Sequence, residues 1–368
     1  MLFILVIAPI ASLVTLTWIF SAGVVNNLPV TIVDQDNTAI SRKIVQMINT
    51  SAIARVESYK PSLLEAKKEM DKGKTEAIIV LPKNLEKEIS KGQSSSVAVY
   101  INNTNLIKGG ALKSGLYKTL ATISTGIKVQ SYMKTGLSER QAINQAMPVQ
   151  LDSHLLFNSF GNYSYFLTIG LLPLMINLLV FMASTYAMGI ELKEKTAGDF
   201  MKTANNSITV ALTGKLIPYT IIFLLHSMLM NFIFFHVIGI PIHGSLGVIL
   251  ISEILQVITY QLIAVLFLSV TSNLRLSLSL GSAYTLMSLS FSGLTFPAIG
   301  MPQIARIFSY VFPNTFWIEI FVSQTLRAQP LSTIAIPFAA FLIFIVGSLA
   351  AFPLMSKRFK NSINWGKI

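Results

Sequence analysis

Long runs of apolar residues, almost free of charge, alternate with shorter polar stretches along most of this chain. A helix needs about 20 apolar residues to cross the roughly 30 Å hydrocarbon layer of a membrane. Runs of about this length predict six transmembrane helices, over residues 2–25, 163–190, 209–238, 246–270, 276–294 and 328–356. The pattern is therefore that of an α-helical polytopic membrane protein.

The first apolar run has a second interpretation, a cleaved signal peptide. Residues 20–23 (Phe-Ser-Ala-Gly) offer small side chains near a possible cleavage point. A signal peptide, however, has a basic leading region and an apolar core of roughly 7–15 residues. Here no Lys or Arg precedes the run, and the run is longer. These features favour a retained first helix.

The stretch 26–160 has a different pattern, in which short β-type runs alternate with helical segments. Strands are predicted over 29–33, 52–56, 77–81 and 97–101, and a long helix over 106–133. This alternation is typical of a small α/β domain. Asp34 and Asp36 are expected to serve in turns and caps rather than in a metal site. Apolar residues at helical spacing, Leu112, Leu116, Leu120, Ile123 and Ile127, predict a core face on the long helix, with docking to a partner's external domain as the alternative.

Between the fifth and sixth predicted spans, residues 296–330 are apolar but interrupted. Proline at this density breaks a straight spanning helix, and the uncharged piece between Arg306 and Glu319 is too short to cross. We therefore predict a re-entrant segment on the external side, with two further spans as the alternative. Its candidate gate residues are Pro297, Pro302, Arg306, Pro313, Glu319 and Arg327, of which the three charged ones are expected to pair.

The orientation follows from the basic residues in the short loops, which stay in the cytoplasm. Six spans place the 191–215 loop, Arg275 and the basic end of the chain on that side, so both termini are cytoplasmic. The predicted organisation is a first helix over 1–25, an external α/β domain over 26–160, a five-helix transmembrane domain over 161–356 and a basic cytoplasmic tail over 357–368. Long domains are translocated largely regardless of charge, so the lysines of the α/β domain agree with this arrangement.

Composition supports the membrane assignment and excludes other classes. Of the 368 residues, 52% are apolar and only 12% are charged, against roughly 25% charged in soluble domains. The stretch 24–162 holds 17 of the 28 Lys and Arg residues and 11 of the 16 Asp and Glu residues. Because both signs are interspersed there, the net charge of +12 does not indicate nucleic-acid binding.

Candidate chemistry is sparse. The chain has no cysteine, and its four histidines lack metal-binding spacing, so a metal enzyme is not expected. The segment 110–119 resembles a phosphate-binding loop, but Lys118 comes two positions late, and no other nucleotide-binding motif is present. We expect no catalytic residue, no metal and no cofactor in this chain.

The order of motifs resembles the permease subunits of bacterial ABC-2 type exporters, in particular the multidrug-efflux branch with a large external insertion. The resemblance rests on Leu-Pro-Val-Thr-Ile-Val-Asp-Gln-Asp over 28–36, Gly-Ile-Glu-Leu-Lys-Glu-Lys-Thr-Ala-Gly over 189–198, Thr-Gly-Lys-Leu-Ile-Pro over 213–218, and the proline-rich segments at 296–302 and 313–319. It implies a permease in the bacterial inner membrane that exports a hydrophobic or amphipathic, drug-like or lipid-like substrate.

The resemblance also implies partners: a separate cytoplasmic ATPase that holds ATP and Mg²⁺, and a second permease copy or a paralogue. An external domain of this size also fits a periplasmic adaptor, and membrane lipid surrounds the spans. The alternative is a membrane-anchored receptor or scaffold whose external domain binds a cell-surface partner without transport.

Two charged positions stand out within this scheme. The loop 191–208 is the candidate ATPase-coupling element, with Glu191, Glu194, Lys195, Gly198 and Asp199, and a merely solvated loop is the alternative. Glu253 is the only ionisable residue clearly inside a predicted span. Because a charge in lipid is costly, it is expected either to face the bundle interior, where it braces a helix or binds a cationic substrate, or to extend to the surface.

Overall fold

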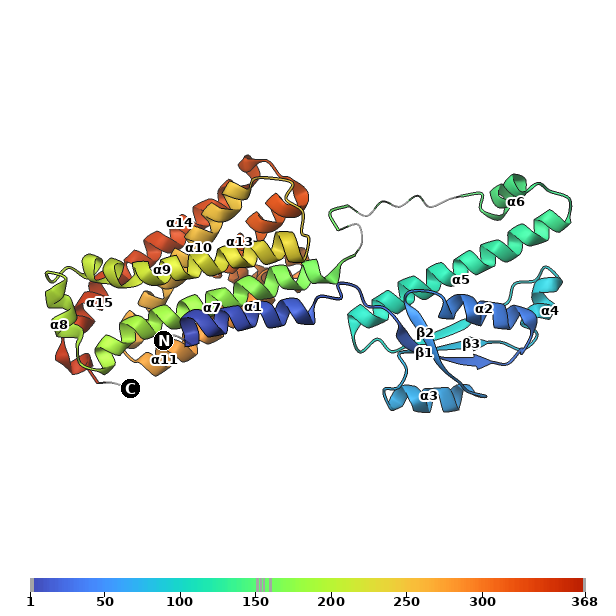
Figure 1. Cartoon of the computed structure of the whole chain (residues 1–368), viewed down its shortest axis with the longest axis horizontal. Coiled ribbons are helices and arrows are strands. Elements are labelled where there is room, and N and C mark those ends of the chain that lie inside the picture. The colour runs from blue at the N-terminus through green and yellow to red at the C-terminus, as the bar shows by residue number, and fades with distance from the viewer. Residues whose placement is uncertain (1–2, 150–151, 153, 155, 159–160, 367–368) are drawn as a thin grey trace. The chain divides into compact units, whose positions relative to one another are not determined.

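The computed structural model describes residues 3–149, 152, 154, 156–158 and 161–366. The chain divides into two compact units, Met1–Gly23 together with Leu155–Ile368, and Val24–His154. We call the first the membrane unit and the second the α/β unit, and each is described separately (Figure 1).

The membrane unit consists of helices. The apolar ones are η1 (Phe3–Ile7), α1 (Ala8–Ile19), α7 (Tyr163–Lys193), α9 (Ile208–Phe232), η2 (Ile233–Val237), α10 (Leu246–Thr271), α11 (Leu274–Phe291), η5 (Leu331–Ile334), α14 (Ala335–Leu349) and α15 (Ala351–Lys360). Among the described residues, four helices are long and apolar enough to cross a membrane: Tyr163–Lys193, Ile208–Val237, Leu246–Thr271 and Leu331–Lys360. The structure thus has the helical architecture of a membrane protein, and the count of six spans stays a prediction.

The first helix is shorter than its apolar run. It ends at Ile19 instead of continuing to Val25, and Gly23 adopts a positive φ of 65°. The backbone N–H of Tyr163 donates to the Gly23 carbonyl, and the Ser164 hydroxyl donates to the Phe20 carbonyl. The carbonyl groups at the end of α1 thus accept hydrogen bonds from the start of α7. Because these carbonyls are paired without further helical turns, the helix can end at Ile19 although apolar residues follow.

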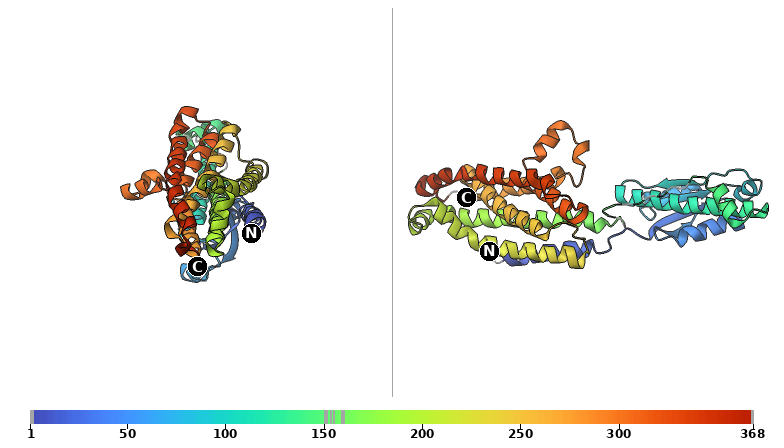
Figure 2. Two further views of the ribbon diagram at one scale, coloured as in Figure 1. Left: turned by 90° about the vertical axis from the view of Figure 1, so that its left-hand side faces the viewer. Right: turned by 90° about the horizontal axis from the view of Figure 1, so that it is seen from above.

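Helix α10 lies inside the bundle, in contact with α7, α11, α13 and α14. Figures 1 and 2 show α7, α9 and α10 running side by side. Their shared core contains large buried side chains from several helices, including Phe181, Phe223, Tyr260, Trp317 and Phe341. This packing buries most positions of α7 and α10, whereas most apolar positions of α9 and α14 are exposed or half-buried.

The stretch 296–330 forms short helices: η3 (Ala298–Gly300), α12 (Gln303–Ser309), α13 (Pro313–Val322) and η4 (Ser323–Arg327). No helix in this fully described stretch reaches spanning length, which argues against the two further spans. Helix α12 projects from the side of the bundle in both views of Figure 2. Helix α13, in contrast, is buried, and its Trp317 is fully enclosed.

The α/β unit contains a four-stranded sheet in the order β2-β1-β3-β4. Strand β1 (Leu28–Asp34) pairs parallel with β2 (Ala54–Tyr59) and β3 (Ala77–Leu81), whereas β4 (Ala98–Ile101) pairs antiparallel with β3. Helices α2 (Ala39–Asn49) and α5 (Leu106–Lys134) cover one face, and α3 (Leu63–Asp71) covers the other (Figure 1). The remaining helices are α4 (Leu85–Ser90) and α6 (Glu139–Ala146).

The apolar positions of the long helix form the core face that their spacing predicts. Leu112, Leu116 and Ile123 of α5 are buried in one core cluster with Val30 and Ile32 of β1. The exposed lysines of α5 lie off these positions. Core packing, rather than a partner, therefore explains the apolar face of α5.

Asp34 and Asp36 have the turn and capping roles expected of them. The Asp36 carboxylate accepts hydrogen bonds from the Leu85 and Glu86 backbone N–H groups, both at 3.0 Å, and from the Thr38 hydroxyl at 2.6 Å. Burial opposes ionisation, but these three donors together hold the pKa of Asp36 below its ordinary value. The carboxylate thus joins the start of α4 to the end of β1.

Helices α7 and α11 come close together at Gly281, where a β-carbon would lie 1.8 Å from the ring of Phe181. We predict that Gly281→Ala destabilises the membrane unit by about 1–3 kcal/mol, the usual cost of adding a methyl group to filled space. Thermal loss of monodisperse protein in detergent measures this effect. Combining it with Phe181→Leu should restore part of the stability.

The matched control is Gly347→Ala on α14, where no atom lies within 4 Å of the added β-carbon. This variant should be as stable as the unchanged protein. A Gly281→Ala variant that survives heating equally well would contradict the close approach of α7 and α11.

Candidate coupling site

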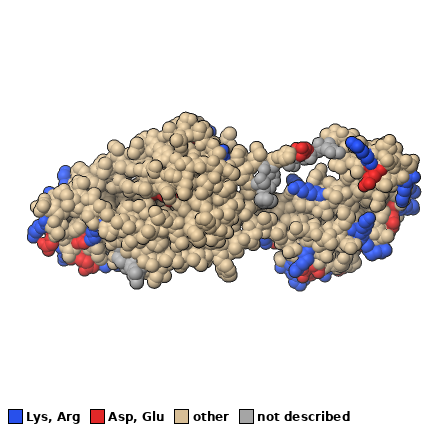
Figure 3. Space-filling view, turned by 45° about the horizontal axis from the view of Figure 1, so that its top comes forward, with Lys and Arg blue, Asp and Glu red and all other residues tan. Residues whose placement is uncertain are grey.

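Charged side chains gather at the end of the membrane unit where α7 and α15 end and α9 begins. Figure 3 shows them there, while the visible face of the rest of this unit is almost uncharged. The stretch between α7 and α9 contains α8 (Ala197–Thr203), so the predicted coupling loop 191–208 is largely helical. Glu191 lies in the last turns of α7 and not in a loop, because α7 continues to Lys193.

Glu191 fastens this stretch to the start of α9. Its carboxylate forms an ion pair with the Lys215 ammonium group and accepts a hydrogen bond from the Thr196 hydroxyl. Only 16% of the Glu191 side chain and 20% of the Lys215 side chain are exposed. Lys215 also lies over the ring of Phe200 on α8, 4.9 Å from its centroid. These contacts join α7, α8 and α9 through one pair of charges.

A sharp turn at Lys195 separates α7 from α8. Lys195 has a positive φ of 64°, and the Thr196 N–H donates to the Glu191 carbonyl over 2.9 Å. The turn sends α8 across the end of the bundle, where Ala197 and Met201 are buried against Met355 and Phe359 of α15. The opposite face of α8 exposes Asp199 and Lys202, whose side chains are 83% and 76% accessible and 3.1 Å apart.

The predicted basic tail 357–368 is not a free tail over its described part. Helix α15 continues to Lys360, and Trp365 then folds back so that its indole N–H donates to the Phe359 carbonyl over 3.1 Å. Arg358 donates to the Ser269 carbonyl at the end of α10. Phe359 and Trp365 thus pack the basic segment against the bundle. The many basic residues of this segment led the sequence analysis to predict an unpacked tail instead.

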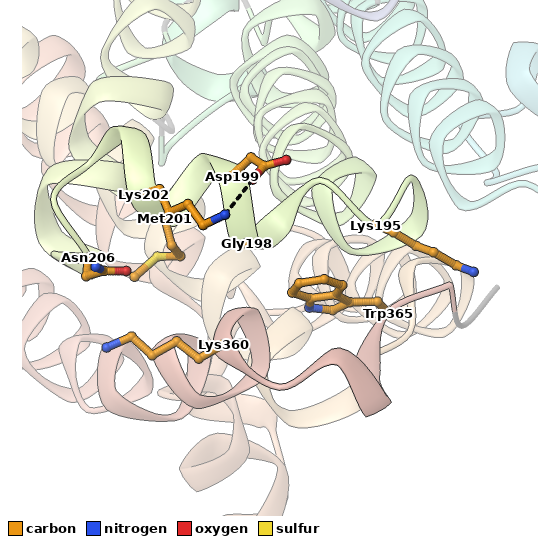
Figure 4. A pocket seen from close by; sticks show the side chains of 8 residues that line it. All are labelled: Lys195, Gly198, Asp199, Met201, Lys202, Asn206, Lys360 and Trp365. Atoms are coloured by element: carbon orange, nitrogen blue, oxygen red, sulfur yellow. Dashed lines mark hydrogen bonds and ion pairs between the residues drawn. The ribbon is translucent and has the colours of Figure 1, made fainter.

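A shallow cavity of about 370 Å³ lies between α8 and this folded segment, lined by Lys195, Gly198, Asp199, Met201, Lys202, Asn206, Lys360 and Trp365 (Figure 4). Gly198 allows the close approach, because a β-carbon there would come within 2.8 Å of the Trp365 ring. In Figure 4, Lys195 and Lys360 point away from each other, while Lys202 bonds to Asp199. The cavity therefore has mixed charge, which suits a side chain of a protein partner.

The coupling residues predicted from the sequence fall into two groups in the structure, those that hold α8 in place and those that face outward. Glu191 faces inward and holds α8 in place, whereas Glu194, with 58% of its side chain exposed, and Asp199 face outward. Lys195 forms the turn and Gly198 the contact with Trp365. Lys215, Phe200 and Trp365 also belong to this site, and sequence reasoning did not assign them to it.

The predicted external gate is arranged differently from the expectation. Arg306, Glu319 and Arg327 are all exposed, and no ion pair joins any two of them. Arg306 therefore does not pair with Glu319, because Arg306 lies on α12, which projects from the bundle, while Glu319 lies on α13. Arg327 is near enough to attract the Glu319 carboxylate electrostatically. The prolines start helices, with Pro302 before α12 and Pro313 as the first residue of α13, and Pro297 precedes η3.

Glu253 is buried inside the bundle, with 3% of the residue exposed, and does not extend to the surface. Its Oε2 accepts a hydrogen bond of 2.9 Å from the Asn231 amide of α9. Deeper in the bundle, the Asn314 side-chain oxygen accepts from the Asn177 and Gln256 amides at 3.1 and 3.2 Å. Amides inside apolar spans are a signal for such contacts, although sequence analysis did not use it. Among the described residues, no group of three His, Asp or Glu side chains suits a metal ion.

The sequence model of the family described as ABC-2 family transporter protein matches residues 1–352, nearly the whole chain. No curated protein matches.

The Glu191–Lys215 pair yields a test of the site's construction. Reversing either charge alone, by Glu191→Lys or Lys215→Glu, should loosen α8, because it leaves a poorly solvated charge facing its like. Trypsin should then cut faster at Lys195 and Lys202. Combining both reversals should restore protection, with a coupling energy of about 1 kcal/mol.

Lys113→Glu on the exposed side of α5 serves as the charge-reversal control and should leave the cleavage rate at Lys195 and Lys202 unchanged. If the double reversal is cut as fast as the single ones, the pair does not hold α8.

Proposed function

This chain belongs to the ABC-2 family of transporter proteins, and on that basis we propose that it is the permease subunit of an ATP-binding-cassette exporter. It provides the membrane pathway, and a separate cytoplasmic subunit binds ATP and Mg²⁺ and supplies the driving force. Members of this family generally work with such an ATP-binding subunit, which supports this kind of partner. A membrane component of this kind is not itself an enzyme.

The observation that carries the proposal is the construction of α8. A coupling element must present exposed polar groups to a partner while it moves together with the spans. Helix α8 does both: Asp199 and Lys202 are exposed, while Met201 is buried against α15 and Glu191 joins α7 to α9. A displacement of α8 by a partner would therefore be transmitted to α7, α9 and α15 together. A merely solvated loop would need neither the ion pair nor the buried Met201.

The finer assignments also belong to this proposal. We place the α8 end in the cytoplasm and the α/β unit outside, in the inner membrane of a bacterium, with both termini cytoplasmic. Positively charged residues at the α8 end, among them Lys193, Lys195, Lys202 and Lys357, support this orientation. The pathway forms with a second copy or a paralogue, and the α/β unit faces a periplasmic adaptor. The cargo is hydrophobic or amphipathic, drug-like or lipid-like, as in the multidrug-efflux branch.

The proposal predicts that charge reversal at two exposed carboxylates, Glu194 at the end of α7 and Asp199 on α8, uncouples the exporter. In the complex with the ATPase, the double variant Glu194→Lys/Asp199→Lys should lower substrate-stimulated ATP hydrolysis by about tenfold or more, because like charges then meet across the contact. The quantities measured are the ATPase rate and the amount of ATPase that copurifies with the chain.

Glu57→Lys, on the exposed surface of the α/β unit, is the matched control and should retain stimulation. Thermal stability of both variants should equal that of the unchanged protein, since neither Glu194 nor Asp199 is buried. Full stimulation in the α8 variant would reject α8 as the coupling element.

A further inference from the structure

A second cavity in the membrane unit has no part in the coupling site. It measures about 190 Å³ and lies where the end of α9 and η2 meet the start of α10. Its lining is apolar and aromatic except for one amide and one imidazole: Met228, Asn231, Phe232, Phe235, His236, Leu246 and Leu250. Met228, Phe232 and Leu246 are largely exposed, so the cavity opens on the lipid-facing side of the helices.

The polar side chain of the lining, Asn231, is bonded to a buried carboxyl group, and each of the two side chains has one oxygen without a hydrogen-bond donor in the described part of the chain. Asn231 is 6% exposed and donates its amide N–H to Glu253, which lies behind it. The remaining oxygens of the two side chains, Oδ1 of Asn231 and Oε1 of Glu253, are buried and have no hydrogen-bond partner among the described residues. Buried polar atoms in folded proteins are normally paired. The Asn231 oxygen is an acceptor, and the Glu253 oxygen is an acceptor when its carboxyl is ionised, so a cationic donor is the group that would pair with both.

The walls add a preference for positive charge. Phe232 and His236 lie ring to ring, with centroids 5.2 Å apart, and Phe235 is stacked on Phe321 of α13 at 6.2 Å. Aromatic faces attract cations, most strongly where water is excluded. No Lys or Arg lines the cavity. A carboxyl group behind the lining amide, aromatic walls and a lining without lysine or arginine together disfavour an anion.

We propose that this cavity binds the ammonium group of an amphipathic amine that enters from the membrane. The ammonium group lies against Asn231, within reach of the field of Glu253, and the hydrocarbon part lies along Leu246, Leu250 and Met228. An ammonium group supplies three donors, whereas a hydroxyl supplies one. The inference rests on the proposed export function, because it names the class of substrate that the permease takes.

Binding to the purified full-length chain in lipid nanodiscs tests the inference directly. The probe is a dansyl-labelled primary alkylamine, compared with the same molecule carrying a hydroxyl in place of the amine. Fluorescence anisotropy should show about tenfold tighter binding of the amine, the discrimination expected from hydrogen bonds to a charged group. Asn231→Leu should remove this preference while binding of the alcohol changes little.

A second variant guards against misfolding of Asn231→Leu. Leu246→Trp fills the cavity from its exposed rim without touching the Asn231–Glu253 contact, and it should abolish amine binding. The matched control is Gln261→Leu, which removes a buried amide on α10. Gln261 is bonded to Thr220 and does not line the cavity, so this variant should bind the amine normally.

Equal affinity for the amine and the alcohol, or amine binding that survives both Asn231→Leu and Leu246→Trp, would overturn the inference. No ATPase is present in the assay, so a failed export function and a failed binding site give different results. Loss of ATP coupling with intact amine binding would reject the former alone.

Discussion

Hydrocarbon excludes charge, and this constraint decides where the polar groups of the membrane unit lie. Apart from Glu253, the charged residues of the four long helices lie near helix ends, and one such end carries the assembly of Glu191, Lys215 and α8. In this pair each charge compensates the other where exposure to water is small, and the ring of Phe200 on α8 lies over the Lys215 ammonium group. The same constraint that keeps the spans apolar thus leaves the exposed charges of the four long helices near their ends.

The interior of the bundle follows a second consequence of the same constraint. Apolar helices in lipid gain little from burying further apolar surface, so small and polar side chains do much of the joining. Gly281 admits Phe181 between α7 and α11, and Asn314 accepts hydrogen bonds from Asn177 and Gln256. The Asn231–Glu253 contact joins α9 to α10 in the same way but leaves two oxygens unpaired. A structural brace and a recognition group for a ligand are therefore compatible in these two residues.

Sequence patterns predicted well those features that depend on local periodicity. The apolar runs located the long helices to within a few residues, and the stripe on residues 112–127 marked the buried face of α5. Features set by tertiary contacts were not predictable in this way. The folding back of Trp365 onto α8 depends on a glycine far away in sequence, and the separation of Arg306 from Glu319 depends on the projection of α12. The end of α1 at Ile19 depends on partners at the start of α7.

The central claim is that α8 and the α/β unit face opposite sides of the membrane, so that force enters at one side and substrate leaves at the other. Because the chain has no cysteine, single replacements at Lys202 on α8 and at Lys87 on α4 can be labelled without background. A membrane-impermeant maleimide should label Lys202→Cys only in inside-out vesicles and Lys87→Cys only in right-side-out vesicles. Labelling of both positions from the same side would contradict the account.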